Sequence, residues 1–261
     1  MNEYGTWFDI VERSSGAKLI DKAVDVLILC RDAGGPVGVT EAARRLGMPK
    51  SSAARIVGAL VRRGFLRQEE PSGKYTLSNV FYSFTSALSE RNLLIPRAVP
   101  AMEKVFRALG ETVHLNVMDA LERVCVHALE SPQSLKAVMP VGQRSPLYCG
   151  GSSKAILAFS DEETVERVFA RPFRKFTGNT ITGKKAMREE IRRIRERGYA
   201  VSHGERVEGI TSVSVPVFHP GGKLGASLTV SVPTARYTEA LMEKILRELT
   251  AASAGITRGM G

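Results

Sequence analysis

The sequence contains no long hydrophobic run. None of its apolar stretches reaches the about 18 consecutive residues that a membrane-spanning helix needs. Residues 1–18 carry acids and lack a basic segment followed by an apolar core, so they do not resemble a secretory signal peptide. With a mean hydropathy of −0.07, the 261-residue chain is typical of a globular protein with room for two domains. We expect it in the cytoplasm and not at a membrane.

Cysteine is also scarce. The three residues Cys30, Cys125 and Cys149 are odd in number, far apart and without a CxxC pair. This pattern fits a reducing compartment and argues against a disulfide framework. The four histidines, at positions 114, 127, 203 and 219, lack a metal-binding spacing such as HxxxH. We therefore predict neither a metal nor another cofactor.

Acidic residues are absent from one particular segment. The chain has a formal net charge of +10, which favours an acidic partner, with nucleic acid ahead of a membrane surface. Between residues 42 and 68 no Asp or Glu occurs, although this segment contains seven basic residues, Arg44, Arg45, Lys50, Arg55, Arg62, Arg63 and Arg67. A second basic stretch, residues 171–197, includes three glutamates and is interpreted as a solvated helix surface.

The acid-free segment includes "LGMPKSSAARIVGALVRRGFL", residues 46–66, which has helical periodicity. One predicted face is apolar and consists of Ala53, Ile56, Val57, Leu60 and Val61. The opposite face carries Ser51, Arg55, Gly58 and Arg62, with Lys50 and Ser52 at the helix start. Pro49 suits the first turn of such a helix, and Gly64 suits its end. The pattern predicts a helix that buries one face and lays the other into a negatively charged groove.

The neighbouring segments predict a winged helix-turn-helix over residues 16–78, after an N-terminal tail at 1–15. "KLIDKAVDVLILC" is helical, with an apolar stripe of Ile20, Ala23, Val24, Leu27 and Ile28. Thr40 is the expected N-cap of a short helix "EAARRL", which ends at Gly47. Downstream, "FLRQEEPSGKYTL" predicts a β-hairpin around residues 71–73.

In a winged helix-turn-helix, the second helix of the pair enters the major groove and the wing follows the backbone. We predict DNA contacts from Thr40, Arg44, Arg45, Lys50, Ser51, Ser52, Arg55, Arg62 and Lys74. Because such readers usually bind two half-sites, a second copy of the chain is expected. The alternatives are a small helical bundle with a solvated basic surface, or a winged helix used for protein contacts.

The remainder of the chain predicts linker helices at 79–110 and an α+β domain at 111–261. Pro96 and Pro100 interrupt the linker pattern, which favours two helices over one rod. Period-two runs predict strands at 112–118, 121–129, 134–140, 211–218 and 225–232, with a hairpin turn at 219–223 between the last two. Helical segments between these groups, and a final helix at about 236–253, complete a mixed, mainly antiparallel sheet flanked by helices.

Several stretches, in this order, resemble the IclR family of bacterial transcriptional regulators. They are "VTEAARRLGMPKSSAARIVGALVRRGFL", "GKYTL", "ETVHLNVMDALERVCVHALES", "VGQRSPLYCGGSSKAILAF" and "GYAVSHGERVEGITSVSVPVF…GASLTVSVP". The resemblance covers nearly the whole chain. It implies an N-terminal winged helix-turn-helix, a C-terminal GAF-like domain that binds a small effector, and homodimers or homotetramers on operator DNA.

The resemblance also implies an effector pocket. Its expected residues are Cys149, Gly150, Gly151, Ser152, His203, Ser212, Thr229 and Ser231. Two positions depart from the family pattern: Ser153 replaces the glycine of a Gly-Lys-Ala sequence, and His203 stands where the family often has Asp. Because a histidine replaces an acid, a carboxylate or other anionic effector becomes easier to accept. The expected function is a ligand-responsive DNA-binding regulator, most simply a repressor.

The segment "CGGSSK" also permits an enzyme interpretation, since it offers a thiol, hydroxyls and a lysine. It does not match GxxxxGK[ST], contains no Ser-x-x-Lys pair, and gives Cys149 no evident base. We therefore predict no catalytic residues. The alternative that stays open is a small-molecule-binding enzyme or sensor whose winged helix contacts proteins.

Overall fold

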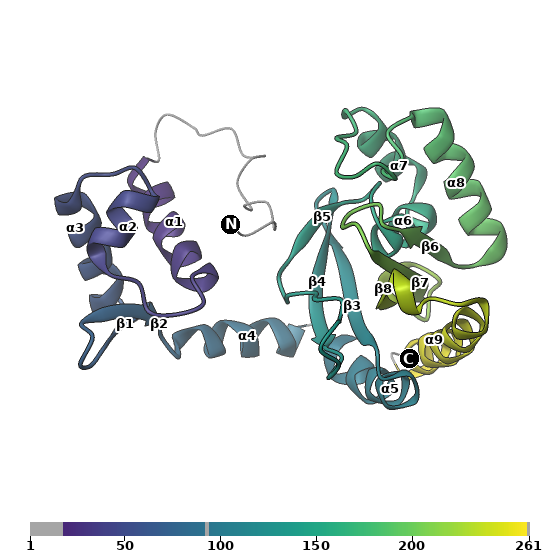
Figure 1. Cartoon of the computed structure of the whole chain (residues 1–261), viewed down its shortest axis with the longest axis horizontal. Coiled ribbons are helices and arrows are strands. Elements are labelled where there is room, and N and C mark those ends of the chain that lie inside the picture. Colours follow the sequence, from purple (N-terminus) through teal and green to yellow (C-terminus); the bar gives the residue numbers. More distant parts are fainter. Residues whose placement is uncertain (1–17, 92–93, 260–261) are drawn as a thin grey trace. The chain divides into compact units, whose positions relative to one another are not determined.

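The computed structural model describes residues 18–91 and 94–259. The chain forms two compact units with a boundary after Arg91, and each is described by itself (Figure 1). The predicted tail at 1–15 lies outside the described residues. The predicted linker, 79–110, is shared between the units, because helix α4 (Val80–Arg91) belongs to the first and α5 (Leu94–Leu109) to the second.

The first unit is a winged helix-turn-helix, as predicted. It contains α1 (Lys18–Asp32), α2 (Val39–Arg45), α3 (Lys50–Arg62), β1 (Leu66–Glu69) and β2 (Lys74–Leu77), followed by α4. The two strands pair antiparallel and form the wing. Helix α3 buries Ala53, Ile56 and Val57, as its periodicity predicts. Gly64 follows the helix with φ +77°, a left-handed conformation that glycine adopts without steric cost.

The apolar stripe predicted on α1 is only partly correct, because Ala23 and Leu27 pack against the core but other members do not. The helix buries Val26, Leu29 and Cys30, whereas Ile20 and Val24 are exposed, Ile20 by 69%. Both sides of this helix are apolar, so periodicity alone could not decide which one faces α3 and β2. The consequence is an exposed apolar surface on α1.

The second unit is built on one six-stranded sheet in the order β5-β4-β3-β8-β7-β6. The strands are β3 (Thr112–Asp119), β4 (Glu122–Leu129), β5 (Arg144–Pro146), β6 (Ala200–His203), β7 (Ile210–Phe218) and β8 (Leu224–Pro233). Every pairing is antiparallel, including the long β7–β8 hairpin that turns at His219–Lys223. The turn is confirmed, and the expected mixed sheet is entirely antiparallel.

The two faces of this sheet differ in polarity. One face is apolar and packs on α5 and α9 (Glu239–Gly259), which lie side by side (Figure 1). On β8, for example, Leu228 and Val230 point to this core, while Ser227, Thr229 and Ser231 point the other way and are also buried. The polar face is covered by α6 (Gly151–Phe159), with α7 (Glu162–Phe169) and α8 (Lys184–Arg197) beyond it (Figure 1). Buried polar strand residues need partners, so this face is the natural place for a site.

Both linker prolines lie inside α5, and neither ends a helix. Pro96 occupies the first turn, where a backbone N–H has no intrahelical partner to lose. Pro100 lies farther in, but α5 buries Leu94, Ala98, Met102 and Val105 in the core. Two helices are present as predicted, yet the prolines are not the division between them.

Two further expectations about the second unit need correction. Residues 134–140 form no strand, because β5 occupies the edge position beside β4. The backbone of residues 134–140 makes a different contact: the Ala137 carbonyl accepts a hydrogen bond from Thr112 Oγ1 at 2.7 Å. The final helix begins at Glu239 and extends to Gly259, after a short 3-10 turn at Thr234–Arg236. None of the helices in the described ranges is long and apolar enough to cross a membrane.

Candidate DNA interface and effector site

Helix α3 presents the side predicted to meet DNA. Lys50, Ser51, Arg55 and Arg62 are exposed, and Ser52 is half-buried at the helix start. No side chain caps this N-terminus, where Pro49 is the N-cap residue. The exposed face therefore combines cationic side chains with a helix N-terminus, two features that bind phosphate groups.

The cations of this unit are mostly available to a ligand. Within the described residues, only Arg45 of the predicted contacts forms an ion pair, at 3.4 Å from Glu41 on the same helix. No carboxylate pairs with Arg44, Lys50, Arg55, Arg62 or Lys74 in that part of the chain. Surface charges without acidic partners are the electrostatic feature expected of a nucleic-acid interface.

The wing is held against the helices by its own backbone. Val37, just before α2, exchanges two hydrogen bonds with Tyr75 of β2, at 2.8 and 2.9 Å. Lys74 is exposed at the start of β2, and Gln68 donates a hydrogen bond to the carbonyl of Gly73 at the tip. The bridge to Val37 fixes the wing relative to the helix pair, as a backbone-following wing requires.

The predicted role of Thr40 as a helix cap is wrong. Helix α2 begins at Val39, its N-cap residue is Gly38, and no side chain bonds to its first turn. Thr40 is instead an exposed residue of that first turn. Its contact with DNA stays a prediction.

The glycine turn before α6 is shaped by close packing on the sheet. Gly150 has φ +92°, which favours glycine, and a Cβ on Gly151 would lie only 2.7 Å from Ser212 Oγ. The backbone N–H groups of this turn already have acceptors: Gly150 donates to Glu205 Oε2 at 3.2 Å and Gly151 to Ser212 Oγ at 3.3 Å. The turn thus joins α6 to β7 and to the loop after β6.

A buried ion pair reinforces that junction. Lys154 of α6 is 1% exposed, and its ammonium donates to Glu205 Oε1 at 2.5 Å, to Glu190 Oε1 at 3.1 Å and to the Val201 carbonyl at 2.9 Å. Three acceptors match the three donors of the ammonium group. The charge of Lys154 is therefore fully neutralised by the protein.

The predicted residues Thr229 and Ser231 lie on the buried polar face. Thr229 donates to Ser214 Oγ at 2.9 Å. Ser231 Oγ lies 2.9 Å from His114 Nε2, and His114 Nδ1 lies 3.1 Å from Asn116 Oδ1. Because an amide oxygen only accepts, Nδ1 carries the proton, and Nε2 accepts from the Ser231 hydroxyl. Asn116 Nδ2 links the two sets by donating to Thr229 Oγ1 at 3.5 Å, so the hydrogen bonds run across β3, β7 and β8.

Burial lowers the pKa of the His114 imidazole to about 3, and the positive charge of Arg123 adds to this effect, while the hydrogen bond to Asn116 opposes it. The unfolded imidazole, with a pKa near 6.5, binds a proton that the folded one excludes. The stabilisation that comes from keeping His114 neutral is therefore fully present above about pH 6.5. It falls as the pH drops towards 3, by at most about 1.4 kcal/mol per pH unit.

Urea unfolding of the protein and of His114→Gln between pH 7 and pH 4 measures this loss of stability. We expect the difference in unfolding free energy to shrink as the pH falls, and a constant difference would contradict it.

His203 is exposed, unlike the buried residues of the polar face. It lies at the end of β6, with Nδ1 3.3 Å from Thr211 Oγ1 and its ring edge-on to Tyr237, centroids 5.2 Å apart. Ser152 is buried in the first turn of α6, and Ser212 borders the glycine turn. The structure thus brings together the glycine turn, Ser212, Thr229 and Ser231, while His203 is at the rim.

The buried Cys149 thiol is unsuited to nucleophilic chemistry. Burial and, to a smaller extent, the nearby Glu205 carboxylate raise its pKa to about 12, although Arg206 has the opposite effect. The thiol stays protonated near neutral pH, and its Sγ lies 3.4 Å from the Glu205 carbonyl. This geometry favours a structural thiol over a catalytic one.

The sequence interpretation missed two arginines, Arg123 and Arg206. Arg123 is 3% exposed on the polar face of β4, beside Asn116. Its position within an alternating strand pattern was a usable signal, because it shares the inward-facing side with Cys125. Arg206, in the loop between β6 and β7, offered no such signal.

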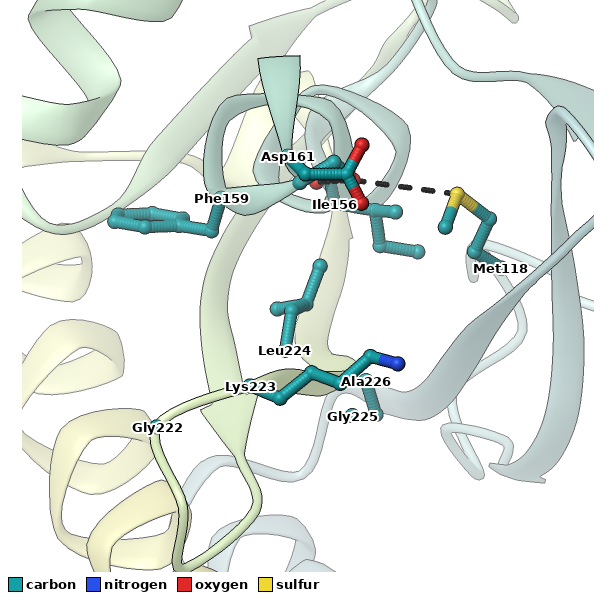
Figure 2. A pocket seen from close by; sticks show the side chains of 10 residues that line it. Met118, Ile156, Phe159, Asp161, Gly222, Lys223, Leu224, Gly225 and Ala226 are labelled. Carbon is teal, nitrogen blue, oxygen red and sulfur yellow. Dashed lines mark hydrogen bonds between the residues drawn. The ribbon is translucent and has the colours of Figure 1, made fainter. Parts of the chain in front are cut away.

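A separate pocket lies at the other end of α6. Figure 2 shows it between Ile156, Phe159 and Asp161 on one side and Leu224 and Ala226 on the other. Its volume is about 390 Å³. None of the predicted effector residues lines it, because they gather at the N-terminal end of α6.

The first unit is a winged helix-turn-helix whose recognition helix lacks acids, and the second is an α+β unit with a buried polar face. Together these features define the class of two-domain transcriptional regulators. The helix-turn-helix domain of IclR matches residues 19–70, and the domain described as "Bacterial transcriptional regulator IclR C-terminal" matches residues 85–258. The chain belongs to the IclR family of bacterial transcriptional regulators, and it is a helix-turn-helix regulator of that family.

Individual relatives agree with this assignment. The transcriptional regulator KdgR of Escherichia coli is 30% identical over 226 residues, which cover 86% of each chain. The regulator BhcR of Paracoccus denitrificans is 29% identical over 250 residues, 95% of this chain and 89% of that protein. The crystal structure of the Thermotoga maritima IclR matches with a TM-score of 0.80 at 29% identity, over 94% of this chain and 99% of that one.

Proposed function

We propose that this regulator binds a palindromic operator through α3 and its wing, as a repressor that a small effector releases. The observation that carries the proposal is the exposed face of α3, which has four polar or cationic residues, Lys50, Ser51, Arg55 and Arg62, in a segment without acids. We assign Arg55 to a base edge, and Lys50, Arg62 and the wing residue Lys74 to phosphates. We place this activity in the cytoplasm and assign no catalysis to the chain.

The exposed apolar residues of the first unit support a dimer. Leu19, Ile20 and Val24 are exposed on α1, and Tyr82 and Leu88 on α4, each by 39% or more. Such apolar surface is unfavourable in water and is typical of a protein interface. Two copies would present two recognition helices to half-sites about 34 Å apart. Pairing of dimers into a homotetramer is part of the same proposal.

Effector control is assigned to the second unit. The polar face beneath α6, with the buried residues Thr229 and Ser231 and the half-buried Ser212, supports a site for a small polar ligand. An IclR homologue from Microbacterium hydrocarbonoxydans, 24% identical to this chain, was crystallised with 4-hydroxybenzoate; this ligand is a property of that protein. Effector and operator must change each other's affinity by the same factor, typically about 1–3 kcal/mol.

The test is a genome-wide capture of DNA fragments by the purified protein, followed by sequencing and binding assays at several salt concentrations. We expect enrichment of a short palindrome. If about six to ten phosphates are neutralised, affinity should fall by about three to five orders of magnitude between 50 and 200 mM salt. A lack of enrichment, or an affinity independent of salt, would contradict the proposal and favour a winged helix used for protein contacts.

A further inference from the structure

Among the described residues, two arginines of the second unit hold positive charge without an ion-pair partner. Arg123 donates from Nη2 to Ser145 Oγ at 2.8 Å and from Nη1 to the Gln143 carbonyl at 3.3 Å, and both acceptors are neutral. Its Nε is buried and has no hydrogen-bond partner. Within residues 18–91 and 94–259, no carboxylate forms an ion pair with this guanidinium group.

The guanidinium group of Arg206 likewise lacks an ion-pair partner among the described residues. Its guanidinium group stacks on the Phe176 ring, 4.1 Å from the centroid, and its Nε is buried without a partner. The backbone beside it is well fixed, because the Glu205 carbonyl accepts hydrogen bonds from Thr180 Oγ1 at 2.7 Å and Thr177 Oγ1 at 3.1 Å. In the described ranges Arg206 also lacks an ion pair with a carboxylate.

The two groups share one environment. Both lie beside the glycine turn, because Arg123 donates to Ser145, which shortly precedes that turn, and the Arg206 Cβ lies 3.9 Å from the position that a Cβ on Gly150 would take. Burial lowers the pKa of Arg123 to about 10, and the positive charge of Arg206 adds to this effect. The nearby carboxylates are engaged elsewhere: Glu205 is bound by Lys154 and by the Gly150 N–H, and Glu122 pairs with Arg144 at 2.6 Å. Two positive charges therefore remain uncompensated beside the glycine turn.

Arg123 is buried, whereas Arg206 is half-buried with only its Nε fully enclosed. An unpaired buried charge is costly, and proteins usually provide it with a partner. A guanidinium group matches a carboxylate especially well, since two parallel N–H donors meet its two oxygens. The unpartnered Nε of each arginine is one such donor. The missing partner is therefore an anion with an acceptor for each guanidinium group.

We propose that Arg123 and Arg206 bind the effector as a small organic dicarboxylate, with one carboxylate for each guanidinium group. The proposal deepens and rests on the proposed effector control of this unit. The backbone N–H groups of the glycine turn are occupied, so the anion is assigned to two arginine side chains, from β4 and from the β6–β7 loop. The Phe176 ring holds the Arg206 side chain in position to bind a carboxylate.

The test measures binding of malonate, succinate, glutarate and phthalate to the full-length protein by calorimetry, with succinamide as a neutral analogue of succinate. We expect at least one of the dicarboxylates to bind and succinamide not to bind. Arg123→Gln and Arg206→Gln should each weaken that dicarboxylate by at least about 30-fold. The matched control is Arg193→Gln, an exposed arginine of α8, which should leave its affinity unchanged.

A second measurement separates lost binding from lost folding. In carboxylate-free buffer, Arg123→Met and Arg206→Met should unfold at a midpoint temperature no lower than that of the wild type, because each removes an unpaired charge. A clearly lower midpoint for both would identify them as structural arginines and overturn the proposal.

The outcomes also separate this proposal from the proposed function. If the protein captures operator DNA but binds no dicarboxylate of the series, or binds one equally well in both Gln variants, the arginine site is wrong and DNA binding stands. If a dicarboxylate binds through both arginines but no DNA fragment is enriched, the arginine site stands and the regulatory role is wrong.

Discussion

Replacement of Lys154 by methionine should lower the free energy of unfolding by about 3–5 kcal/mol, the cost of breaking a buried ion pair from one side. Methionine has a similar length, so the packing of α6 changes little. The Glu205 carboxylate, however, would stay buried with only the Gly150 N–H as a hydrogen-bond donor, and the Val201 carbonyl would lose its donor. Urea denaturation followed by circular dichroism measures the change.

A double variant distinguishes the ion pair from a simple packing defect. Lys154→Met combined with Glu205→Gln removes both charges and keeps an acceptor for the Gly150 N–H, so most of the lost stability should return. Glu190 retains its other partner, Arg197, at 3.2 Å. Lys184→Met, at the exposed start of α8, is the matched control and should have little effect. Equal stability of Lys154→Met and the wild type would refute a role for this pair.

Replacement of Arg55 by alanine should weaken binding to a specific operator by about 1–3 kcal/mol if this side chain reads a base. Arg55 is exposed on α3 and has no ion pair within the described residues, and alanine favours helix, so folding should be preserved. The expected loss is therefore one of contact and not of structure. Fluorescence anisotropy with a labelled operator, taken from the enriched fragments, measures it.

The pattern of the loss identifies the kind of contact. A base contact predicts that Arg55→Ala tolerates changes at one operator position that weaken wild-type binding, whereas a phosphate contact predicts uniform weakening and a smaller salt slope. Arg193→Ala, in the second unit, is the control and should bind the operator like the wild type. Unchanged affinity and sequence preference for Arg55→Ala would remove it from the interface.

The sequence by itself determined the elements whose signals are local. Residues 46–66 identified α3 because the apolar stripe repeats at helical spacing and glycine follows the end of the helix. The wing was equally visible, since a Pro-Ser-Gly turn separates two short strands. The cationic face of α3 needed only the absence of acids from residues 42–68, a property that folding does not change.

Tertiary structure decided which side of an element is buried and which distant residues meet. On α1, apolar residues lie on two sides, and only the neighbours α3 and β2 select Val26 and Leu29 for the core. Lys154 and Glu205 are 51 residues apart, and their pairing depends on α6 crossing the sheet beside β6. No local pattern encodes such an encounter.

The effector site also combines features that the sequence predicts with features that only the tertiary structure decides. Thr229 and Ser231 could be placed on a strand by alternation and by resemblance, but alternation does not say which face a helix covers. Arg123 and Arg206 come from separate parts of the sheet order, on β4 and after β6, and only the folded sheet brings each of them beside the glycine turn. Their lack of a counter-ion is a property of that arrangement, because charge compensation depends on distances that the sequence does not contain.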